Sequence, residues 1–171
     1  MNLLIFSDSH GNFRAIDKAI ALQDALPASQ RPNYILFLGD GLTDLGRLTI
    51  PSGASLLAVS GNCDGFSPEG EPELRVPVFA NRRTVMMHGH RFSVKYGPER
   101  AVSLAVAENA DILLFGHTHQ PLAEQYEAGE MVYGVRLSKP LLIFNPGSIR
   151  EGSFGSISVT DKGIFATHGH I

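Results

Sequence analysis

The sequence predicts an α/β fold, and three observations lead to that prediction. Short apolar runs over 2–6, 34–38 and 56–59 are typical of buried strands. A segment with helical spacing separates the first two runs, and this alternation favours parallel pairing of the strands. Each run also leads into a turn with a carboxylate or carboxamide side chain, and functional residues of such sheets lie beyond the carboxyl ends of the strands.

The elements of the first half follow in order. Asn2–Phe6 is expected to be a buried strand that runs into the loop SDSHGN. A helix is expected over Phe13–Leu26, because its apolar residues fall on one stripe, with Asn12 placed to cap it and a proline after it. The second strand, Tyr34–Leu38, ends in Gly-Asp-Gly, and the third, Leu56–Val59, ends in SGNCDG.

The second half is expected to contain a strand pair, a helix and a series of short strands. After a loop over 66–72, Leu74–Phe79 and Arg83–His88 are expected to pair. A helix is expected after Pro98, and Asp111–Phe115 is typical of a buried strand. Turn residues separate the remaining strands and favour antiparallel pairing; these strands are Glu124–Tyr126, Met131–Arg136, Leu141–Phe144, Gly155–Thr160 and Gly163–Thr167.

Composition narrows the class of protein. The 171 residues fit a single domain over 1–171, and the net charge of −3 without a basic run argues against nucleic-acid binding. No apolar stretch approaches the ~18 residues of a membrane span. The single cysteine, Cys63, excludes an internal disulfide and suits a reducing compartment. With a start that lacks a signal peptide's basic region, this predicts a cytoplasmic protein.

The histidines are paired more often than chance allows. Seven histidines predict about 0.3 His-x-His pairs from composition alone, yet the chain has three. His117 and His119 follow an expected strand, and side chains two residues apart on an extended segment point the same way. Two adjacent imidazoles have no use in a packed core, but they can bind a metal ion.

Other potential ligands follow the remaining strands. They are Asp8, His10, Asp40, Asn62, Asp64 and His88. Nitrogen and oxygen ligands without thiolate suit Mn, Fe, Co, Ni or Zn rather than Ca or a structural zinc. So many ligands exceed the needs of one four-coordinate ion, and they suit a pair of ions ~3.5–4 Å apart that share a carboxylate.

These motifs resemble the signature of the calcineurin-like metallophosphoesterases. Within them the chain is similar to the small bacterial and archaeal phosphodiesterases, to which the non-catalytic retromer subunit Vps29 is related. The motifs are DSH at 8–10, GD at 39–40, GNCD at 61–64, HGH at 88–90, GHTH at 116–119 and NPGS at 145–148. The resemblance implies a four-layer αββα sandwich of two mixed β-sheets, with a dinuclear metal site at the C-terminal edge of the strands.

The resemblance also implies which residues bind the metals. One ion would be held by Asp8, His10, Asp40 and His119, and the other by Asp40, Asn62, His88 and His117, so that Asp40 bridges them. Together these seven residues form the expected catalytic site, with two divalent cations as cofactors. Mn²⁺ is the first expectation, with Ni²⁺, Fe²⁺, Co²⁺ and Zn²⁺ as alternatives.

Several nearby residues have two interpretations. Asn12 is a helix cap or a phosphate contact, and both roles are compatible near a helix N-terminus. Asp64 is expected to orient the loop of Asn62 or a neighbouring imidazole, and His90 to lie beside the ligands or at the substrate's edge. Asn12, Asn62, Cys63 and Asp64 form the expected substrate contacts. His168 and His170 are expected to belong to a frayed terminus.

Cys63 departs from the pattern of many relatives. Relatives with phosphatase or nuclease activity often carry histidine at this position, where it is thought to help protonate the leaving group. Cysteine recurs in the small phosphodiesterases, so the resemblance favours a phosphodiesterase in which a metal-bridging hydroxide attacks phosphorus. The alternatives are a Vps29-like scaffold and a phosphomonoesterase or nucleotide phosphatase. The expected partner is a small phosphodiester rather than a membrane, and homo-oligomer formation stays open.

Overall fold

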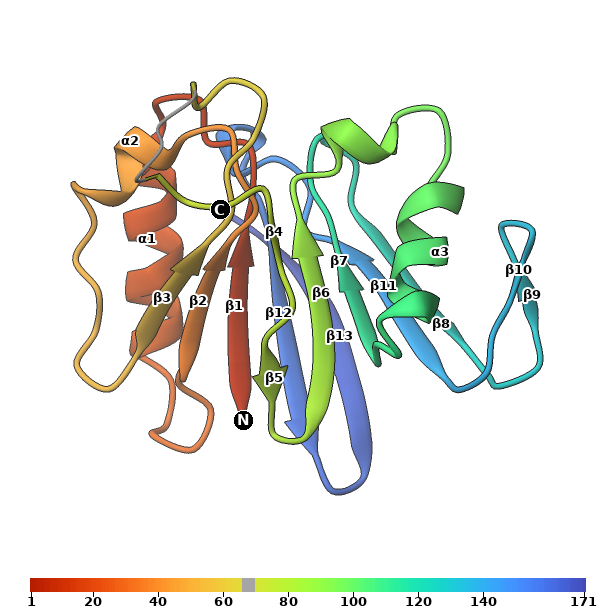
Figure 1. The fold of residues 1–171 in the computed structure, drawn as a ribbon. Helices are drawn as coiled ribbons and strands as arrows, with labels where there is room; N and C mark the ends of the chain where they lie inside the picture. The colour runs from red at the N-terminus through yellow and green to blue at the C-terminus, as the bar shows by residue number, and fades with distance from the viewer. Residues whose placement is uncertain (66–69) are drawn as a thin grey trace.

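The computed structural model describes residues 1–65 and 70–171, which form two β-sheets with helices on their outer faces (Figure 1). The larger part of the predicted loop over 66–72 therefore lies outside the described residues. The fold is α/β with two mixed sheets, as the sequence predicts.

The first sheet contains the three strands predicted from the N-terminal half. Its order is β13-β12-β1-β2-β3. β1 (Asn2–Phe6), β2 (Tyr34–Phe37) and β3 (Ser55–Ala58) pair in parallel, whereas β12 (Ser153–Thr160) and β13 (Gly163–His170) are antiparallel. The crossover between β1 and β2 is helix α1, Phe13–Asp24, and the short helix α2, Leu42–Leu45, follows β2.

The second sheet is built from the rest of the chain, in the order β4-β6-β7-β11-β8 with β5 paired to β6. Helix α3, Glu99–Ala107, connects β6 to β7. The strands are β4 (Leu74–Arg75), β5 (Val78–Phe79), β6 (Arg82–Met87), β7 (Ile112–Leu114), β8 (Leu122–Tyr126) and β11 (Leu141–Asn145). In Figure 1 the arrowheads of β1, β2, β3, β6 and β7 all point to one edge of the molecule.

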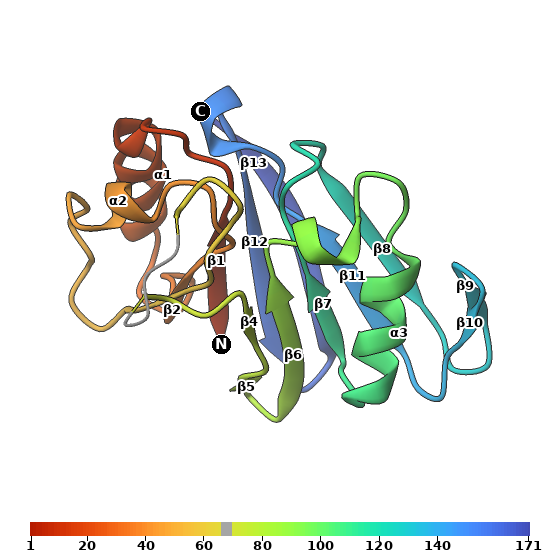
Figure 2. The same ribbon diagram turned by 45° about the horizontal axis from the view of Figure 1, so that its top comes forward.

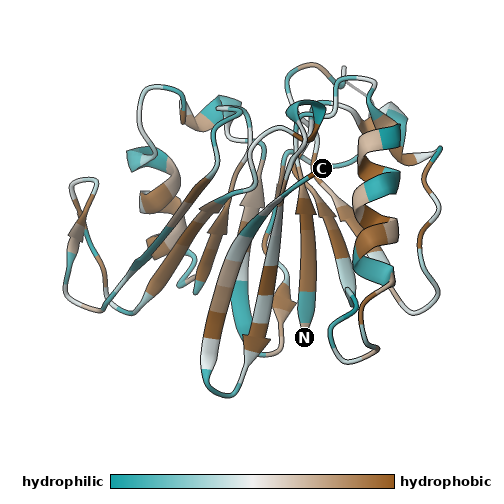
Figure 3. Cartoon of the chain, turned by 180° about the vertical axis from the view of Figure 1, so that it is seen from behind, coloured by the Kyte–Doolittle hydropathy of each residue, from teal (hydrophilic) through white to brown (hydrophobic). Residues whose placement is uncertain are grey.

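Three apolar clusters separate the layers. Residues such as Ile5, Leu36 and Phe144 fill the space between the two sheets. A second cluster joins α1 to the outer face of the first sheet, and a third joins α3 to the outer face of the second. Figure 2 shows this succession of helix, sheet, sheet and helix, and Figure 3 shows that hydrophobic residues dominate the central strands. The predicted four-layer αββα architecture is confirmed.

Two expectations for the second half were wrong. Met131–Arg136 is not one strand but a hairpin of β9 (Met131–Val132) and β10 (Val135–Arg136). Tyr133 and Gly134 have φ of 48° and 75°, a conformation that turns the chain back on itself. The tail is also not wholly antiparallel, because β11 pairs in parallel with β7.

The C-terminus is not frayed, contrary to the expectation for His168 and His170. Both residues belong to β13, which pairs with β12 along its whole length. The imidazole of His168 stacks on Phe144 at 4.7 Å between ring centroids, and its Nε2 lies 2.8 Å from the carbonyl oxygen of Asn145. These contacts come from residues distant in sequence, so the polar composition of the tail did not reveal them. Among the described residues, no helix combines the length and apolar character that a membrane crossing requires.

Candidate metal centre

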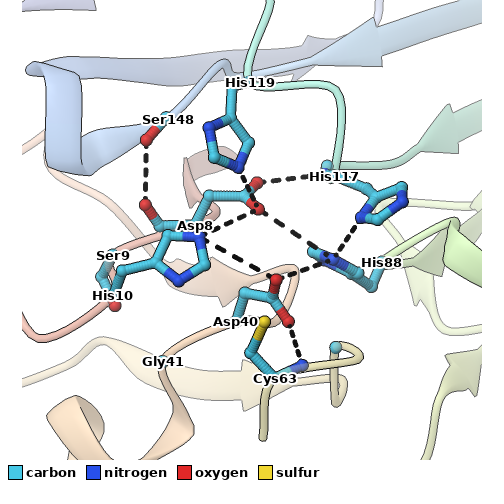
Figure 4. A network of polar contacts seen from close by, with 12 residues as sticks. Asp8, Ser9, His10, Asp40, Gly41, Cys63, His88, His117, His119 and Ser148 are labelled. Carbon is cyan, nitrogen blue, oxygen red and sulfur yellow. Dashed lines mark hydrogen bonds and ion pairs between the residues drawn. The ribbon is translucent and has the colours of Figure 1, made fainter. Parts of the chain in front are cut away.

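The predicted ligands meet at the edge to which the parallel strands point. Figure 4 shows Asp8 and His10 from the loop after β1, Asp40 from the loop after β2, and His88 directly after β6. His117 and His119 come from the loop after β7. The carboxyl ends of strands from both sheets thus supply one cluster, as the parallel pairing predicts.

One group of potential ligands consists of Asp8, His10 and His119. One ligand atom from each lies within 4.8 Å of the other two. Oδ1 of Asp8 lies 3.1 Å from Nε2 of His119 and 3.9 Å from Nε2 of His10. Asp8 is fully buried, and its other oxygen accepts a hydrogen bond from the backbone N–H of His117 at 3.0 Å.

A second group consists of Asp40, His88 and His117. Nε2 of His88 lies 3.3 Å from Oδ2 of Asp40 and 3.1 Å from Nδ1 of His117. His88 is fully buried, and its Nδ1 lies 2.8 Å from the carbonyl oxygen of Leu38. That contact requires a proton on Nδ1, so in the neutral imidazole the lone pair of Nε2 faces Asp40 and His117.

Asp40 connects the two groups. Its Oδ2 lies 3.9 Å from Nε2 of His10 in the first group and 3.3 Å from Nε2 of His88 in the second. The other oxygen, Oδ1, accepts a hydrogen bond from the backbone N–H of Cys63 at 2.8 Å. Asp40 therefore lies between the two groups of potential ligands.

Five of these six residues have a left-handed backbone. The φ angles are 56° for Asp8, 44° for His10, 61° for Asp40, 65° for His117 and 61° for His119. Such angles are uncommon for residues other than glycine and cluster at functional sites. The five residues lie in the loops that follow β1, β2 and β7, where their side chains converge on one cluster (Figure 4).

Two glycines let the loops after β2 and β3 approach one another. A Cβ on Gly39 would lie 2.5 Å from the backbone nitrogen of Gly61, and a Cβ on Gly61 would lie 2.1 Å from Oδ1 of Asp40. Both distances are far too short for a real contact. The GD and GN motifs therefore require glycine, because the backbone of Gly61 occupies the space of a Cβ at position 39 and Asp40 occupies that of a Cβ at position 61.

The electrostatics of the cluster favour a bound cation. Burial would raise the pKa of Asp40, but hydrogen bonds from His88 and the Cys63 amide outweigh it and lower that pKa. Burial would lower the pKa of His88, yet the carboxylates of Asp40 and Asp8 raise it above its ordinary value. Both shifts have the sign expected where buried carboxylates attract positive charge to the centre.

One buried oxygen tests independently whether these residues fit a metal cation. Oδ1 of Asp8 is inaccessible to water and accepts no hydrogen bond from the described residues. An ionised oxygen in that position is costly unless a cation or a donor compensates it. Because two histidine nitrogens approach the same oxygen within 4 Å, the residues present fit a divalent cation with nitrogen and oxygen ligands.

Asp64 acts as a clamp between the loops that follow β2 and β3. Oδ2 accepts hydrogen bonds from the backbone N–H groups of Asp40 and Gly61, at 2.8 and 2.7 Å. Oδ1 accepts from Gly41 and Leu42, at 2.7 and 2.8 Å. One carboxylate therefore receives four backbone donors and fixes the loop of Asp40 to the loop that carries Asn62.

The remaining predicted residues surround the cluster. Asn12 caps α1, its side chain accepting from the N–H of Ala15. Asn62 is exposed and its Nδ2 donates to Sγ of Cys63 at 3.2 Å, so its role as a ligand stays a prediction. Sγ of Cys63 instead lies within 4.8 Å of ligand atoms of His10 and Asp40. A hydrogen bond with Asp40, and then burial, raise the pKa of the Cys63 thiol.

His90 lies beside the second group without belonging to it. Its ring centroid is 5.5 Å from that of His88 and 6.2 Å from that of His117. Its Nε2 lies 3.7 Å from Oε1 of Glu73. The imidazole therefore borders the centre at a distance that leaves the ligand positions to its neighbours.

Sequence reasoning missed several residues that hold the ligand loops. Asp44 is buried, and its Oδ2 accepts from Oγ of Ser9 at 2.6 Å and from the N–H of Gly11 at 2.9 Å. Ser148 donates its hydroxyl hydrogen to the carbonyl oxygen of Asp8 at 2.9 Å. Of these, only Ser148 had a signal in the sequence, because it belongs to the NPGS motif.

The chain is similar in sequence to proteins of a known family. Residues 1–162 match the family model described as "Calcineurin-like phosphoesterase superfamily domain". Phosphodiesterase YfcE of Escherichia coli is 29% identical over 191 aligned positions, which cover 97% of this chain and 90% of YfcE.

Solved structures share the fold at lower identity. A structure from a functional study of an archaeal phosphodiesterase has a TM-score of 0.67 at 20% identity, covering 99% of this chain and all of the other. Vps29 of Entamoeba histolytica, solved with zinc, has a TM-score of 0.59 at 20% identity, covering 99% of each chain.

Proposed function

Because the chain belongs to the calcineurin-like phosphoesterase superfamily, we propose that it hydrolyses phosphodiesters with two divalent metal ions held by the cluster described above. One observation carries the proposal. Two groups of ligands lie next to each other, and Oδ2 of Asp40 is within 4 Å of a histidine nitrogen in each. This is the arrangement that a two-metal site for phosphoryl transfer requires.

The residues have separate tasks in this proposal. Asp8, His10 and His119 hold one ion, and His88, His117 and Asn62 hold the other, with Asp40 between them. When bound, two divalent ions supply polarisation of the phosphoryl oxygens and a water of lowered pKa. Mn²⁺ is our first choice, because the ligands are nitrogen and oxygen atoms that also suit Fe, Co, Ni and Zn.

Cys63 limits which leaving groups can depart, because a leaving oxygen that is not protonated must be stable as an anion. A hydrogen bond with Asp40, and then burial, raise the pKa of the Cys63 thiol, so the thiol releases its proton less readily. A thiol is also a weak proton donor compared with an imidazole. The preferred substrates are therefore diesters whose leaving oxygen carries its own negative charge, as a phenolate does.

Two alternative functions must be distinguished from phosphodiester hydrolysis. A scaffold related to Vps29 is one, but metal binding does not separate the two functions, since a Vps29 structure was solved with zinc. What favours catalysis is that six of the seven predicted ligands converge in one cluster. A phosphomonoesterase is the other alternative, and it would have to accommodate a dianionic substrate on the same site.

The test is a substrate panel on protein freed of metal and then reconstituted with Mn²⁺, Ni²⁺, Co²⁺ or Zn²⁺. Bis(p-nitrophenyl) phosphate, cyclic nucleotides and p-nitrophenyl phosphate represent aryl diesters, natural diesters and monoesters. We expect metal-dependent turnover that is greatest on the aryl diester and is abolished by Asp40→Asn. Asp17→Asn, the same chemical change at a half-buried carboxylate of α1 that belongs to neither group of ligands, serves as the control. Faster turnover of the monoester would favour the phosphatase, and metal-loaded protein without any turnover would favour the scaffold.

A further inference from the structure

A cavity of about 700 Å³ borders the metal centre at Asn62, one of the proposed ligands. Further lining comes from residues 70–73 before β4 and from His90 and Arg91 after β6. The ring centroid of His90 is 5.5 Å from that of the proposed ligand His88. Because the cavity and the centre share residues in this way, a group bonded to a phosphorus atom at the centre can extend directly into the cavity.

The charged side chains in the described lining of this cavity are balanced. Glu71 forms an ion pair with Arg75, and Glu73 forms one with Arg91. Both oxygens of Asp64 are occupied by the four backbone donors of the clamp. A charged ester group would have to compete with an existing ion pair here, so the lining favours a group that is polar and uncharged.

Each of the two glutamates keeps one oxygen that can accept further hydrogen bonds. Oε2 contacts the arginine in both cases, and no described residue donates a hydrogen bond to Oε1 of Glu71 or of Glu73. Nε2 of His90 lies 3.7 Å from Oε1 of Glu73, which is too long for a hydrogen bond. A carboxylate with a free oxygen is the group with which proteins bind the hydroxyls of a sugar such as ribose.

A second cavity, of about 410 Å³, borders the centre at His119. Two of its polar side chains are already engaged, since Oγ of Ser153 donates to a backbone carbonyl at 2.7 Å and Nε2 of His168 lies 2.8 Å from another. Its only carboxylate in the described lining is Glu151, whose Oε1 lies 3.8 Å from Nδ1 of His119. The cavity at Asn62 therefore offers an ester group more free hydrogen-bond acceptors.

The position of Cys63 indicates which ester group enters the cavity at Asn62. Cys63 is not part of the lining, and its Sγ lies within 4.8 Å of ligand atoms of His10 and Asp40. Figure 4 shows Cys63 beside Asp40. If the leaving oxygen faces Cys63, as the proposed function implies, the cavity at Asn62 is available for the group that stays on phosphorus.

We propose that the cavity at Asn62 binds the retained ester group and that Glu73 selects substrates in which this group carries a vicinal diol. The proposal rests on the phosphodiesterase function and names its substrate class: phosphodiesters with one polyol arm, such as a ribose or an open-chain polyol. Glu73 determines specificity and has no part in metal binding. Its ion pair with Arg91 joins two segments of the lining and holds the carboxylate between them.

The experiment measures kcat/KM on p-nitrophenyl phosphodiesters that share the leaving group and differ in the retained arm. One pair carries a butyl or a 3,4-dihydroxybutyl arm, and a second pair carries a 2′,3′-dideoxyuridin-5′-yl or a uridin-5′-yl arm. The two pairs distinguish an open-chain polyol from a ribose ring. The dihydroxybutyl arm has no hydroxyl on its second carbon, because a hydroxyl there would attack phosphorus without the enzyme. A 3-carboxypropyl arm, compared with butyl, measures the preference for an anion.

The proteins compared are wild type, Glu73→Ala and Glu151→Ala, each loaded with Mn²⁺. The two variants make the same chemical change and the same change in net charge. Each removes a carboxylate from one of the two cavities that border the centre. Glu151→Ala is therefore the matched control for Glu73→Ala.

We expect wild type to favour the diol by about tenfold in at least one pair, the lower end of what a hydrogen bond to a charged acceptor contributes. Glu73→Ala should reduce this preference to within about twofold, whereas Glu151→Ala should keep it. Glu73→Ala should also raise the preference for the 3-carboxypropyl arm by up to about fivefold, because Arg91 then lacks its partner. Metal content, measured by elemental analysis, should be the same in Glu73→Ala as in wild type.

The outcomes separate this proposal from the function on which it rests. Turnover of both pairs by wild type without a preference for the diol would overturn the proposal and leave the phosphodiesterase intact. A diol preference that survives in Glu73→Ala, or that is lost equally in Glu151→Ala, would overturn the role of Glu73. Loss of metal in Glu73→Ala would show that this residue supports the centre and does not act on specificity alone. Failure of metal-loaded wild type to cleave any diester would overturn the proposed function itself.

Discussion

Replacing Asp64 by asparagine should destabilise the fold far more than loss of one surface charge would. Each carboxylate oxygen of Asp64 accepts two backbone hydrogen bonds, at distances of 2.7–2.8 Å. Asparagine keeps one oxygen and replaces the other by an NH₂ group, which cannot accept. Two of the four backbone donors therefore lose their partner and face another donor.

The magnitude follows from these two bonds. Hydrogen bonds to a charged group contribute about 1.5–3 kcal/mol each, and the lower value applies because Asp64 is only partly buried. The loss is then about 3 kcal/mol, which in a chain of this length corresponds to a fall in Tm of roughly 6–12 °C. The NH₂ group should replace Oδ1, because Gly41 and Leu42 are half-buried whereas Asp40 and Gly61 are buried.

Urea denaturation of the metal-free protein measures the free energy of unfolding without a contribution from metal binding. Asp17→Asn is the matched control, because Asp17 accepts one exposed hydrogen bond from Thr49 at 3.2 Å and asparagine retains that acceptor. The control should stay within about 0.5 kcal/mol of wild type. If Asp64→Asn did so as well, the clamp would not be what holds the two loops together.

Three further predictions concern the metal centre. Elemental analysis after reconstitution with Mn²⁺ should give about two ions per chain, and full activity at one ion would contradict the dinuclear arrangement. Asp40→Asn should lose both metals and essentially all turnover, whereas His119→Ala should lose less metal; equal, mild defects would argue against Asp40 as the bridge. Cys63→His should raise kcat/KM on an alkyl diester more than on a nitrophenyl diester, since a general acid typically contributes ~10²–10⁴ in rate. An unchanged aryl-to-alkyl ratio at matched metal content would show that residue 63 does not face the leaving group.

The parts of the fold that the sequence predicted well are those set by local pattern. The apolar run Asn2–Phe6 and the stripe within Phe13–Asp24 have periodicities that identify a buried strand and an amphipathic helix. The hairpin around Tyr133 was missed because its turn depends on a left-handed residue that is not glycine. The strand Gly163–Thr167 was predicted, but its extension to His170 was missed because His168 is held by Phe144 and Asn145, contacts that no local window contains.

The candidate site also combines residues that a local pattern reveals with residues that only contacts between distant parts of the chain reveal. The ligands are visible in the sequence because each follows a strand and belongs to a short motif. The residues that hold those ligands are less visible, since Asp44 reaches the loop of Ser9 through space, 35 positions away. A single aspartate in a polar stretch looks like any turn residue, and only the structure identifies its partners.

The left-handed backbone of the ligand residues bears on how such a protein changes over generations. A non-glycine residue in this conformation costs about 1–2 kcal/mol, so five of them together amount to a cost comparable with the ~5–15 kcal/mol by which whole domains are stable. Glycine at any of these positions would relieve that cost and remove a ligand at the same time. Random substitution in a lineage that no longer used the centre would therefore drift toward a firmer fold without its aspartates and histidines. These five positions are therefore the ones at which a glycine substitution should raise the free energy of unfolding while removing one of the proposed ligands.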